Sequence, residues 1–369
     1  PSGTHSTRGI TVCSSDVVLD CGGATIVGNR GSSLGIGIVV NSFDRVTIQN
    51  CNVRVYQSGI GVYNADDTLV YRNTVTNSGT GITVDSNNIL GRAANNNRIE
   101  ENTATTNGVG ISVGPSFSTI VKKNNVNTNN LGGLQIRYAY GSNVTENNAD
   151  GNGNYGISIY RGRGLNVNDV VGNHSITNNS AQRNGNSGIY ITATTDNNIE
   201  GNQASLNTLY GIFMDVSARN NQIRTNKIEG NTVHGIYLRL SSVNTIEENE
   251  VVLNDQHGIS VTESNYNNIS NNHVAENGVS GISLTKTHHN DIINNTVEKN
   301  AWVGINLEEG SDFNNVLGNN ATENGDDGIG TWSSSSGGCP AFSTNNNNIS
   351  ENTVSKNKHE GIHLYCANR

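Results

Sequence analysis

The sequence is poor in several residue types that common folds need. Its 369 residues include three prolines, one methionine and two tryptophans, and only 33% are hydrophobic. No apolar run approaches the roughly 20 residues of a transmembrane helix, and no signal peptide is evident after Pro1. A mean hydropathy of −0.47 would indicate disorder in a sequence without internal order. Order is present, however, as a strict repeat rich in asparagine and glycine.

Charged residues are also scarce. They make up 14% of the chain, and the formal net charge is −9 at pH 7. An acidic protein repels polyanions at long range, which argues against nucleic acid or a membrane surface as a partner.

The repeat is marked by glycines that are each followed by Ile or Leu. Most of these glycines are 22 to 24 residues apart. A period of this size is typical of a solenoid, in which each unit buries its apolar side chains only by stacking on its neighbours. The glycines are Gly35, Gly59, Gly81, Gly110, Gly133, Gly156, Gly188, Gly211, Gly235, Gly258, Gly281, Gly304, Gly328 and Gly361.

The interior of one repeat predicts which solenoid is formed. In residues 235–256, short apolar runs alternate with polar residues and are separated by Asn and Ser clusters, so three short strands per coil are expected. The signature of leucine-rich repeats is absent, and the composition does not suit helical pairs. We therefore predict an all-β, single right-handed parallel β-helix of about 14 coils over residues 1–369, with a capping coil at 1–34 and an end coil at 333–369.

Asparagines recur at matching places in the repeat, as in residues 197–202, 220–226, 267–272 and 290–295. Stacked coils place these amides over one another, where they can hydrogen-bond along the axis. We expect most of the asparagine to be structural.

Five cysteines indicate an oxidising compartment. Cys21 and Cys51 are one coil apart and can pair, with Cys13 beside them, although Cys51 would also suit the core as a small apolar residue. Cys339 and Cys366 are similarly spaced and can pair at the C-terminal end.

The repeat resembles that of known parallel β-helix proteins. The unit NNISNNHVAENGVSGISL at 267–284 and the opening segment VVLDCGGATIVG at 17–28 resemble NosD-type periplasmic repeat proteins and the β-helix enzymes of polysaccharide chemistry, namely alginate lyases, mannuronan C5-epimerases and pectate-lyase-like proteins. The resemblance covers the chain from about Ile10 onward. It implies the fold strongly and the function weakly.

A candidate site follows from the residues of the glycine strands that should point outward. At the third position of these strands the middle coils have aromatic residues, whereas most other coils have small polar residues or glycine. At the fifth position two of the middle coils have the charged residues Asp215 and Arg239. This strip consists of Tyr190, Phe213, Asp215, Tyr237 and Arg239, preceded in their coils by Tyr210, His234 and His257. Rings beside charged groups are typical of sugar-binding surfaces.

Three insertions after glycine strands, at residues 86–97, 161–175 and 333–346, are expected to form walls beside this strip. Arg161 lies in the second insertion, and Arg137 and Tyr160 precede it. These three residues predict a basic, aromatic patch that grips a uronate, or an Arg–Tyr stack that only covers the sheet. With Tyr190, Phe213 and His257, they are the predicted substrate-binding residues.

Lyase chemistry on a uronate needs a group that neutralises the carboxylate, a base for the C5 proton and an acid for the leaving oxygen. We assign neutralisation to Arg239, the base to His234 or His257, and the acid to Tyr237 or Tyr210. Asp215 would orient a histidine or act itself.

The family resemblance implies a Tyr-Gly-Φ-Asp-x-His segment for the epimerases. In YGIFMD at 210–215, Tyr210 matches the motif, but Phe213 stands at its Asp position and Asp215 at its His position. This departure argues against epimerase activity.

The sequence thus predicts a secreted, cell-surface or periplasmic protein whose partner is a polysaccharide, with a uronate lyase as the leading hypothesis. The alternative is a non-catalytic structural or carbohydrate-binding protein of the envelope. A hydrolase ranks third, because Asp215 has no acidic partner nearby. We assign no metal site and no cofactor; the adjacent His288 and His289 are expected to face solvent. Calcium is possible at Glu308, Glu309 and Asp312 or at Asp326 and Asp327. His273, His288 and His289 also invite a metal reading, which the resemblance to NosD-type proteins connects with copper.

Overall fold

The structure is a computed structural model that describes residues 3–6, 8–28, 35–86, 94–161, 171–332 and 344–365. Its contacts divide the chain into two compact units, unit 1 (Pro1–Gly185) and unit 2 (Asn186–Arg369). Each unit is described by itself. The expectation of a single domain stays a prediction.

Unit 1 consists of short strands that form three parallel ladders. The glycine ladder contains β2 (Ile10–Val12), β5 (Ile36–Asn41), β8 (Ser58–Tyr63), β11 (Thr80–Asp85), β14 (Val109–Val113), β16 (Gly132–Arg137) and β18 (Tyr155–Tyr160). The second contains β3 (Val18–Asp20), β6 (Thr47–Gln49), β9 (Leu69–Tyr71), β12 (Arg98–Glu100), β15 (Ile120–Lys122), β17 (Asn143–Thr145) and β19 (Ser175–Thr177). The third contains β1 (Thr4–Ser6), β4 (Thr25–Val27), β7 (Asn52–Arg54), β10 (Thr74–Thr76) and β13 (Thr103–Thr105).

Unit 2 repeats this arrangement. Its glycine ladder contains β20 (Ile189–Thr192), β22 (Ile212–Asp215), β25 (Ile236–Arg239), β28 (Ile259–Thr262), β31 (Ile282–Thr285), β34 (Ile305–Glu308), β37 (Ile329–Trp332) and β40 (Ile362–Leu364). The second contains β21 (Asn198–Glu200), β23 (Gln222–Arg224), β26 (Thr245–Glu247), β29 (Asn268–Ser270), β32 (Asp291–Ile293), β35 (Asn315–Leu317) and β38 (Asn348–Ser350). The third contains β24 (Lys227–Glu229), β27 (Glu250–Val252), β30 (His273–Ala275), β33 (Thr296–Glu298), β36 (Asn320–Thr322) and β39 (Thr353–Ser355).

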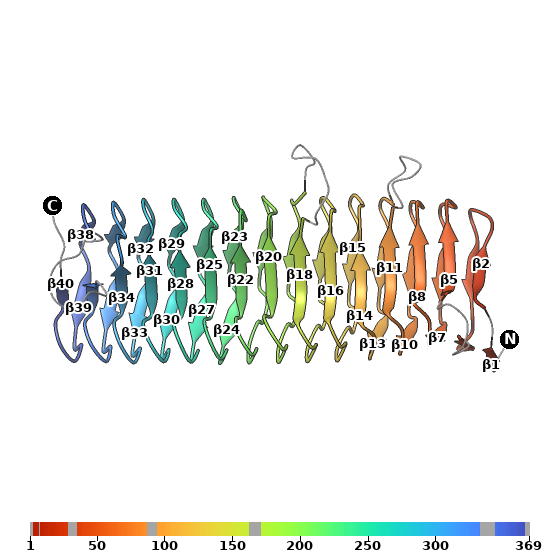
Figure 1. Ribbon diagram of the computed structural model, residues 1–369, viewed down its shortest axis with the longest axis horizontal. Helices are drawn as coiled ribbons and strands as arrows, with labels where there is room; N and C mark the ends of the chain where they lie inside the picture. Colours follow the sequence, from red (N-terminus) through yellow and green to blue (C-terminus); the bar gives the residue numbers. More distant parts are fainter. Residues whose placement is uncertain are drawn as a thin grey trace. The chain divides into compact units, whose positions relative to one another are not determined.

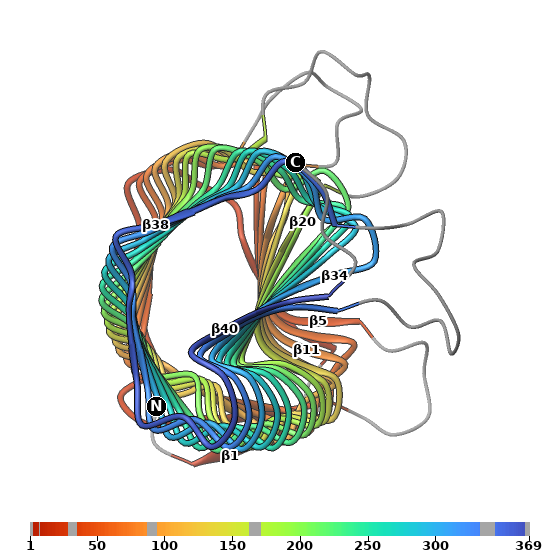
Figure 2. The ribbon, with the colours of Figure 1, turned by 90° about the vertical axis from the view of Figure 1, so that its left-hand side faces the viewer.

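Each strand pairs in parallel with the equivalent strand of the next coil, and equivalent residues face each other. Ile212 pairs with Ile236, and Ile236 pairs with Ile259. Within each unit the arrows of one ladder follow one another in sequence (Figure 1), and the coils lie over one another along the stack (Figure 2). The expected all-β parallel β-helix is therefore confirmed, and no helix occurs in the part of the chain that the structure describes.

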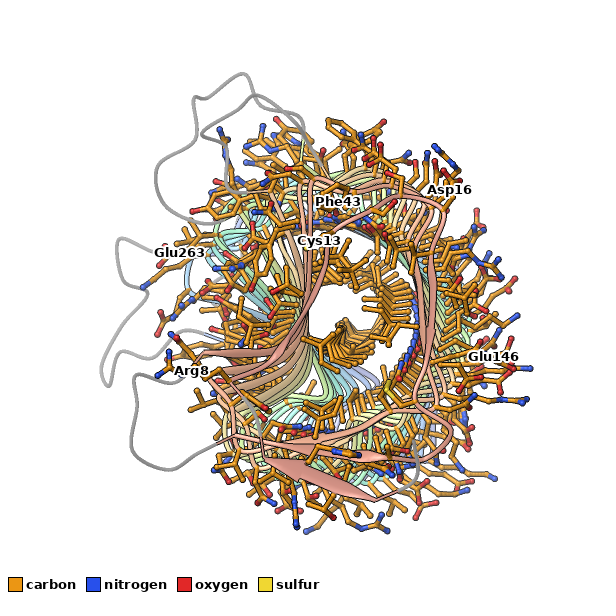
Figure 3. The ribbon with its side chains drawn as sticks, turned by 90° about the vertical axis from the view of Figure 1, so that its right-hand side faces the viewer. Arg8, Cys13, Asp16, Phe43, Glu146 and Glu263 are labelled. Carbon is orange, nitrogen blue, oxygen red and sulfur yellow. A yellow bond between two sulfur atoms is a disulfide. The ribbon has the colours of Figure 1, made fainter. Side chains whose placement is uncertain are left out.

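Aliphatic residues of each coil fill the inside. Ile212, Ile236, Ile259 and Ile282 are all 0% exposed, as the alternation in the glycine strands predicts. The interior rows of carbon-rich side chains are visible in Figure 3, where charged residues such as Glu146 and Glu263 point away from the coil. Few apolar residues per coil suffice because each is covered by its equivalents above and below.

Asparagine ladders line the inner corners of the coils, as expected. In one of them, Asn249 accepts hydrogen bonds from the backbone N–H and the side-chain amide of Asn226 at 3.0 and 2.9 Å, and donates its own N–H and amide to Asn272 at 3.0 and 2.9 Å. Its amide also donates to the Ile223 carbonyl. One side chain per coil thereby satisfies backbone groups that the corner would leave without partners.

The repeated glycine is required because adjacent parts of the coils approach each other closely at this position. A Cβ atom at Gly235 would lie 2.4 Å from Cγ1 of Val251 and 2.7 Å from the carbonyl oxygen of Gly258. Both contacts are far shorter than van der Waals distances, so any larger residue would push the coils apart.

The predicted pairing of Cys21 with Cys51 is confirmed, since the two residues form a disulfide. Cys13 is free and exposed. Cys339 and Cys366 lie outside the described residues, as do most residues of the three insertions and of the expected end coil before residue 344. Among the described residues, no helix is long and apolar enough to cross a membrane.

Candidate functional site

The outward side chains of β20, β22 and β25 form a row of rings in unit 2. Strand register places Tyr190 beside Phe213 and Phe213 beside Tyr237. Their ring centroids are 5.4 and 5.2 Å apart, and the second pair is stacked with an interplanar angle of 9°. These separations are close to one coil step, so the ladder itself sets the ring spacing.

A second row of rings comes from the residues that precede the glycines. Tyr210 stacks on His234 at 5.7 Å, and His234 stacks on His257 at 5.2 Å. The two rows touch, because the Tyr210 ring lies 4.9 Å from Phe213 and 5.1 Å from Tyr237. We call these six residues, Tyr190, Tyr210, Phe213, His234, Tyr237 and His257, the aromatic cluster.

The aromatic cluster is partly open to solvent. Phe213 is buried at 9% exposure, whereas the other five members are half-buried. In the coils that follow, the positions equivalent to Tyr237 hold Ser260 and Ser283. These aromatic side chains therefore lie next to one another on one surface of unit 2, as the sequence predicted.

A bidentate ion pair borders the cluster. Arg239 donates from Nε to Oδ1 and from Nη2 to Oδ2 of Asp215, both at 2.8 Å, and its guanidinium lies 5.6 Å from the Phe213 ring centroid. Hydrogen bonding to Asp215 raises the pKa of Arg239, which stays charged. The Arg239 side chain is 47% exposed and that of Asp215 is 9% exposed. The guanidinium is therefore the charged group of this pair that is accessible to solvent.

The two histidines of the cluster are held neutral. Burial lowers the pKa of His234 to about 3, with a smaller contribution from His257, and burial lowers the pKa of His257 to about 4. Nδ1 of His234 accepts the N–H of His257 at 3.3 Å, and Nδ1 of His257 accepts the N–H of Ser280 at 3.2 Å. In a neutral ring whose Nδ1 accepts, the proton is on Nε2, which makes each ring a hydrogen-bond donor toward its open side.

The tyrosines of the cluster also keep their protons. Burial raises the pKa of Tyr210 and of Tyr190 above the usual value. Both hydroxyls are therefore donors at neutral pH.

The other predicted binding residues, Arg137, Tyr160 and Arg161, lie in unit 1. Arg137 and Tyr160 are register partners in β16 and β18, and Arg161 follows directly. Arg137 is bound by Asp85 of β11, with Nη2 2.8 Å from Oδ2. Sequence reasoning missed this partner, although both residues occupy the same outward position two coils apart.

The acidic residues considered for calcium have other contacts. Glu309 lies 3.5 Å from Lys286 Nζ, and Glu308 contacts the Thr285 hydroxyl and the Asn306 amide. Burial raises the pKa of Glu308. Asp312 accepts the N–H of Asn345 at 2.6 Å.

Comparison with known proteins agrees with this architecture. A model of the right-handed β-helix region matches residues 17–170. The chain is thus one of the right-handed β-helix proteins. The model for the periplasmic copper-binding protein NosD matches residues 161–301 and 275–369, more than half of the chain, so the protein belongs to the NosD family. No curated protein sequence matches it significantly.

Several solved structures are similar to this chain at low identity. A point mutant of the periplasmic alginate epimerase AlgG is 15% identical over 99% of this chain and 78% of that chain, with a TM-score of 0.51. The A-module of mannuronan C-5 epimerase AlgE4 from Azotobacter vinelandii is 14% identical over 100% of this chain and 89% of that chain, with a TM-score of 0.40. The Dettilon tailspike protein is 15% identical over 71% of this chain and 58% of its own, with a TM-score of 0.46. At 15% identity the likeness to the AlgG structure concerns the fold alone.

Proposed function

We propose that this protein binds an acidic polysaccharide on the aromatic cluster of unit 2. The observation that carries the proposal is the continuity of six half-buried or buried rings over neighbouring coils, bordered by the exposed guanidinium of Arg239. Packing alone does not require such rings, because the following coils have serine at the same outward position.

The chemistry of the cluster suits a sugar chain. Rings offer apolar contact to the C–H faces of sugars, while the phenol O–H group of Tyr210 and the Nε2–H groups of the histidines donate to hydroxyls or carboxylates. Since Asp215 engages Nε and Nη2 of Arg239, the Nη1 side of the guanidinium remains for a uronate carboxylate.

A lyase on the same surface is the second candidate. It is favoured by the contact between Tyr210 and Tyr237, since a phenol that keeps its proton can act as the acid toward the leaving oxygen. A lyase also needs a base that takes the C5 proton, and neither histidine of the cluster suits this role. Each histidine uses the Nδ1 lone pair for a backbone N–H and carries its proton on Nε2, so neither nitrogen is free to take the C5 proton. Binding is therefore the function we favour, and the predicted catalytic roles of His234, Tyr237, Tyr210, Asp215 and Arg239 remain hypotheses.

A location outside the cytoplasm fits this function. The Cys21–Cys51 disulfide forms in oxidising compartments, and the family model describes a periplasmic protein. We propose a periplasmic or secreted protein.

A glycan panel tests the proposal. Alginate, pectate, glycosaminoglycans and neutral glucans would be compared by affinity electrophoresis, with ultraviolet absorbance of each mixture followed in parallel. We expect an acidic polymer to retard the protein without a rise in absorbance. A rise in absorbance from an unsaturated product would establish the lyase instead, and no retardation by any acidic polymer would contradict both functions.

A further inference from the structure

Both tryptophans of the chain lie in adjacent coils of unit 2, outside the aromatic cluster. Trp302 stands two residues before Gly304, and Trp332 is the last residue of β37. Their ring centroids are 5.5 Å apart. The Trp332 ring also contacts the next coil, where the rings of His363 and Tyr365 lie 5.7 and 6.3 Å away. Both tryptophans are half-buried, so the pair keeps a surface that is open to solvent.

Gly330 provides the space in which the Trp332 ring lies. A Cβ atom at Gly330 would lie 3.1 Å from Nε1 of Trp332 and 3.4 Å from Cγ1 of Val303. The indole therefore lies close over the backbone of its own strand. At the same outward position, Asn306 is the register partner of Gly330 in the preceding coil. The indole nitrogen and the Asn306 side chain thus belong to neighbouring strands of the glycine ladder.

Two polar atoms at this place have no hydrogen-bond partner among the described residues. Asn306 is 0% exposed, and although its Nδ2 donates to Glu308, its Oδ1 accepts no hydrogen bond. Nε1 of Trp332 is a buried donor without an acceptor. Buried polar groups are nearly always paired. An acceptor and a donor left without partners in neighbouring strands therefore indicate a ligand that has both kinds of group.

The charge around the two tryptophans is negative. Glu308 is the register partner of Trp332, and burial without a cationic partner raises the pKa of its carboxyl group. The carboxylate of Asp327 is 1% exposed and lies 3.0 Å from Nδ1 of His363, whose ring contacts Trp332. The sequence contains no arginine at positions 240–365. This surface therefore differs in sign from the aromatic cluster, which Arg239 borders.

We propose that Trp302, Trp332, Asn306 and Glu308 bind an amino sugar, with its protonated amine beside Glu308. Tryptophan attracts cations more strongly than other aromatic side chains do, and its face also suits the C–H face of a sugar. The amine can donate to Oδ1 of Asn306, and a sugar hydroxyl can accept from Nε1 of Trp332. Because both atoms are enclosed, the Trp332 ring turns aside on binding. The net charge of −9 favours the approach of a cationic chain.

Intrinsic fluorescence tests this site directly, because the chain has no other tryptophans. The probe is a glucosamine oligosaccharide in a mildly acidic buffer that keeps its amines protonated. Its N-acetylated counterpart has the same sugar backbone without the charge. We expect a saturable fluorescence change with the first and at least tenfold weaker binding of the second.

Calorimetry then compares variants with the same two oligosaccharides. Trp332→Ala should weaken binding of the glucosamine oligosaccharide about tenfold or more, and Glu308→Gln should remove most of the preference for the amine. Tyr266→Ala and Glu263→Gln are the matched controls. They remove an exposed ring and an exposed carboxylate of the same unit outside this site, so both should bind like the wild type.

Three results would overturn the proposal: no saturable binding of the glucosamine oligosaccharide, equal affinity for its N-acetylated counterpart, or equally tight binding of choline, a cation without a sugar. If Trp332→Ala perturbs the fold by circular dichroism, Glu308→Gln decides, because an amide replaces a carboxyl group of the same shape. An unchanged preference for the amine in folded Glu308→Gln would contradict the site. None of these results depends on whether the aromatic cluster binds an acidic polymer.

Discussion

Arg239 and Asp215 are register partners in adjacent strands and form a two-point ion pair, with both nitrogen–oxygen distances at 2.8 Å. The pair fixes the guanidinium beside the rings of the aromatic cluster. Because almost half of the Arg239 side chain is exposed, the pair itself stabilises the fold by only about 0–1 kcal/mol. Its importance should therefore appear in ligand binding rather than in stability.

The first prediction concerns this pair. Arg239→Lys keeps the charge but loses the planar two-point geometry, so it should weaken binding of an acidic glycan about tenfold while the melting temperature changes little. Affinity electrophoresis and thermal unfolding would measure the two effects. Arg45→Lys is the control, because Arg45 forms a similar bidentate pair with Asp16 away from the aromatic cluster. Equal losses of binding in both variants would contradict the assignment.

The second prediction concerns the asparagine ladders. Asn319 accepts from the N–H and amide of Asn295, and donates to Asn352 and to the Ile292 carbonyl. Asn319→Leu leaves several buried polar groups without partners, each worth about 1–3 kcal/mol, and should lower the urea midpoint strongly. Asn320→Leu, at the next and exposed position, should lower it little. Similar midpoints for the two variants would show that the ladder is not a major source of stability.

The third prediction concerns pH. His174 is 2% exposed, and burial lowers its pKa to about 4. The His174 imidazole takes up a proton below about pH 6.5 in the unfolded chain, whereas in the folded chain it stays neutral down to about pH 4. The contribution of neutral His174 to stability is therefore complete above about pH 6.5 and is lost as the pH falls toward 4. For His174 the loss is up to roughly 3 kcal/mol.

The variant His174→Asn should reduce this acid sensitivity and preserve the fold. Nδ1 of His174 accepts the N–H of Ser142 at 3.1 Å, just as the Asn97 side chain accepts the N–H of Thr68 at 2.9 Å in an earlier coil. Urea unfolding between pH 4 and 7 would measure the change, with His273→Asn as the exposed control. A slope against pH identical to that of the wild type would contradict the account.

The fourth prediction concerns the disulfide. Cys21 and Cys51 close a loop with a sequence separation of 30, so removing both as Cys21→Ser/Cys51→Ser should destabilise the N-terminal coils by about 3–4 kcal/mol. Limited proteolysis under mild denaturant would detect earlier cleavage at that end. Cys13→Ser should have no such effect, because Cys13 is free and exposed. Unchanged proteolysis of the double variant would contradict this expectation.

The fold was predictable from the sequence because each coil has the same types of residue at the same positions. The glycine spacing, the inward Ile residues such as Ile236 and the corner asparagines such as Asn249 all recur with one period, so a few repeats define the rest. The disulfide was also predictable, since a separation of one coil brings Cys21 over Cys51.

The site was only partly predictable, because pairings between coils depend on local length. Phe213 and Tyr237 lie in coils of regular length, and their proximity followed from the period. Asp327 and His363 are separated by an insertion, which concealed that Nδ1 of His363 lies 3.0 Å from Oδ2 of Asp327. The tautomers of His234 and His257 depend on which backbone N–H each ring accepts, and no sequence pattern indicates that.

The central claim is that the aromatic cluster binds an acidic polysaccharide. The most direct measurement is the calorimetric affinity of the wild type, Tyr237→Ala and Tyr266→Ala for the acidic polymer that binds best in the panel. Tyr266 is an exposed ring of the same unit, 60% exposed and stacked on His289, outside the cluster. The account predicts that Tyr237→Ala weakens binding about tenfold or more, whereas Tyr266→Ala binds like the wild type. Wild-type affinity in a folded Tyr237→Ala protein would contradict it.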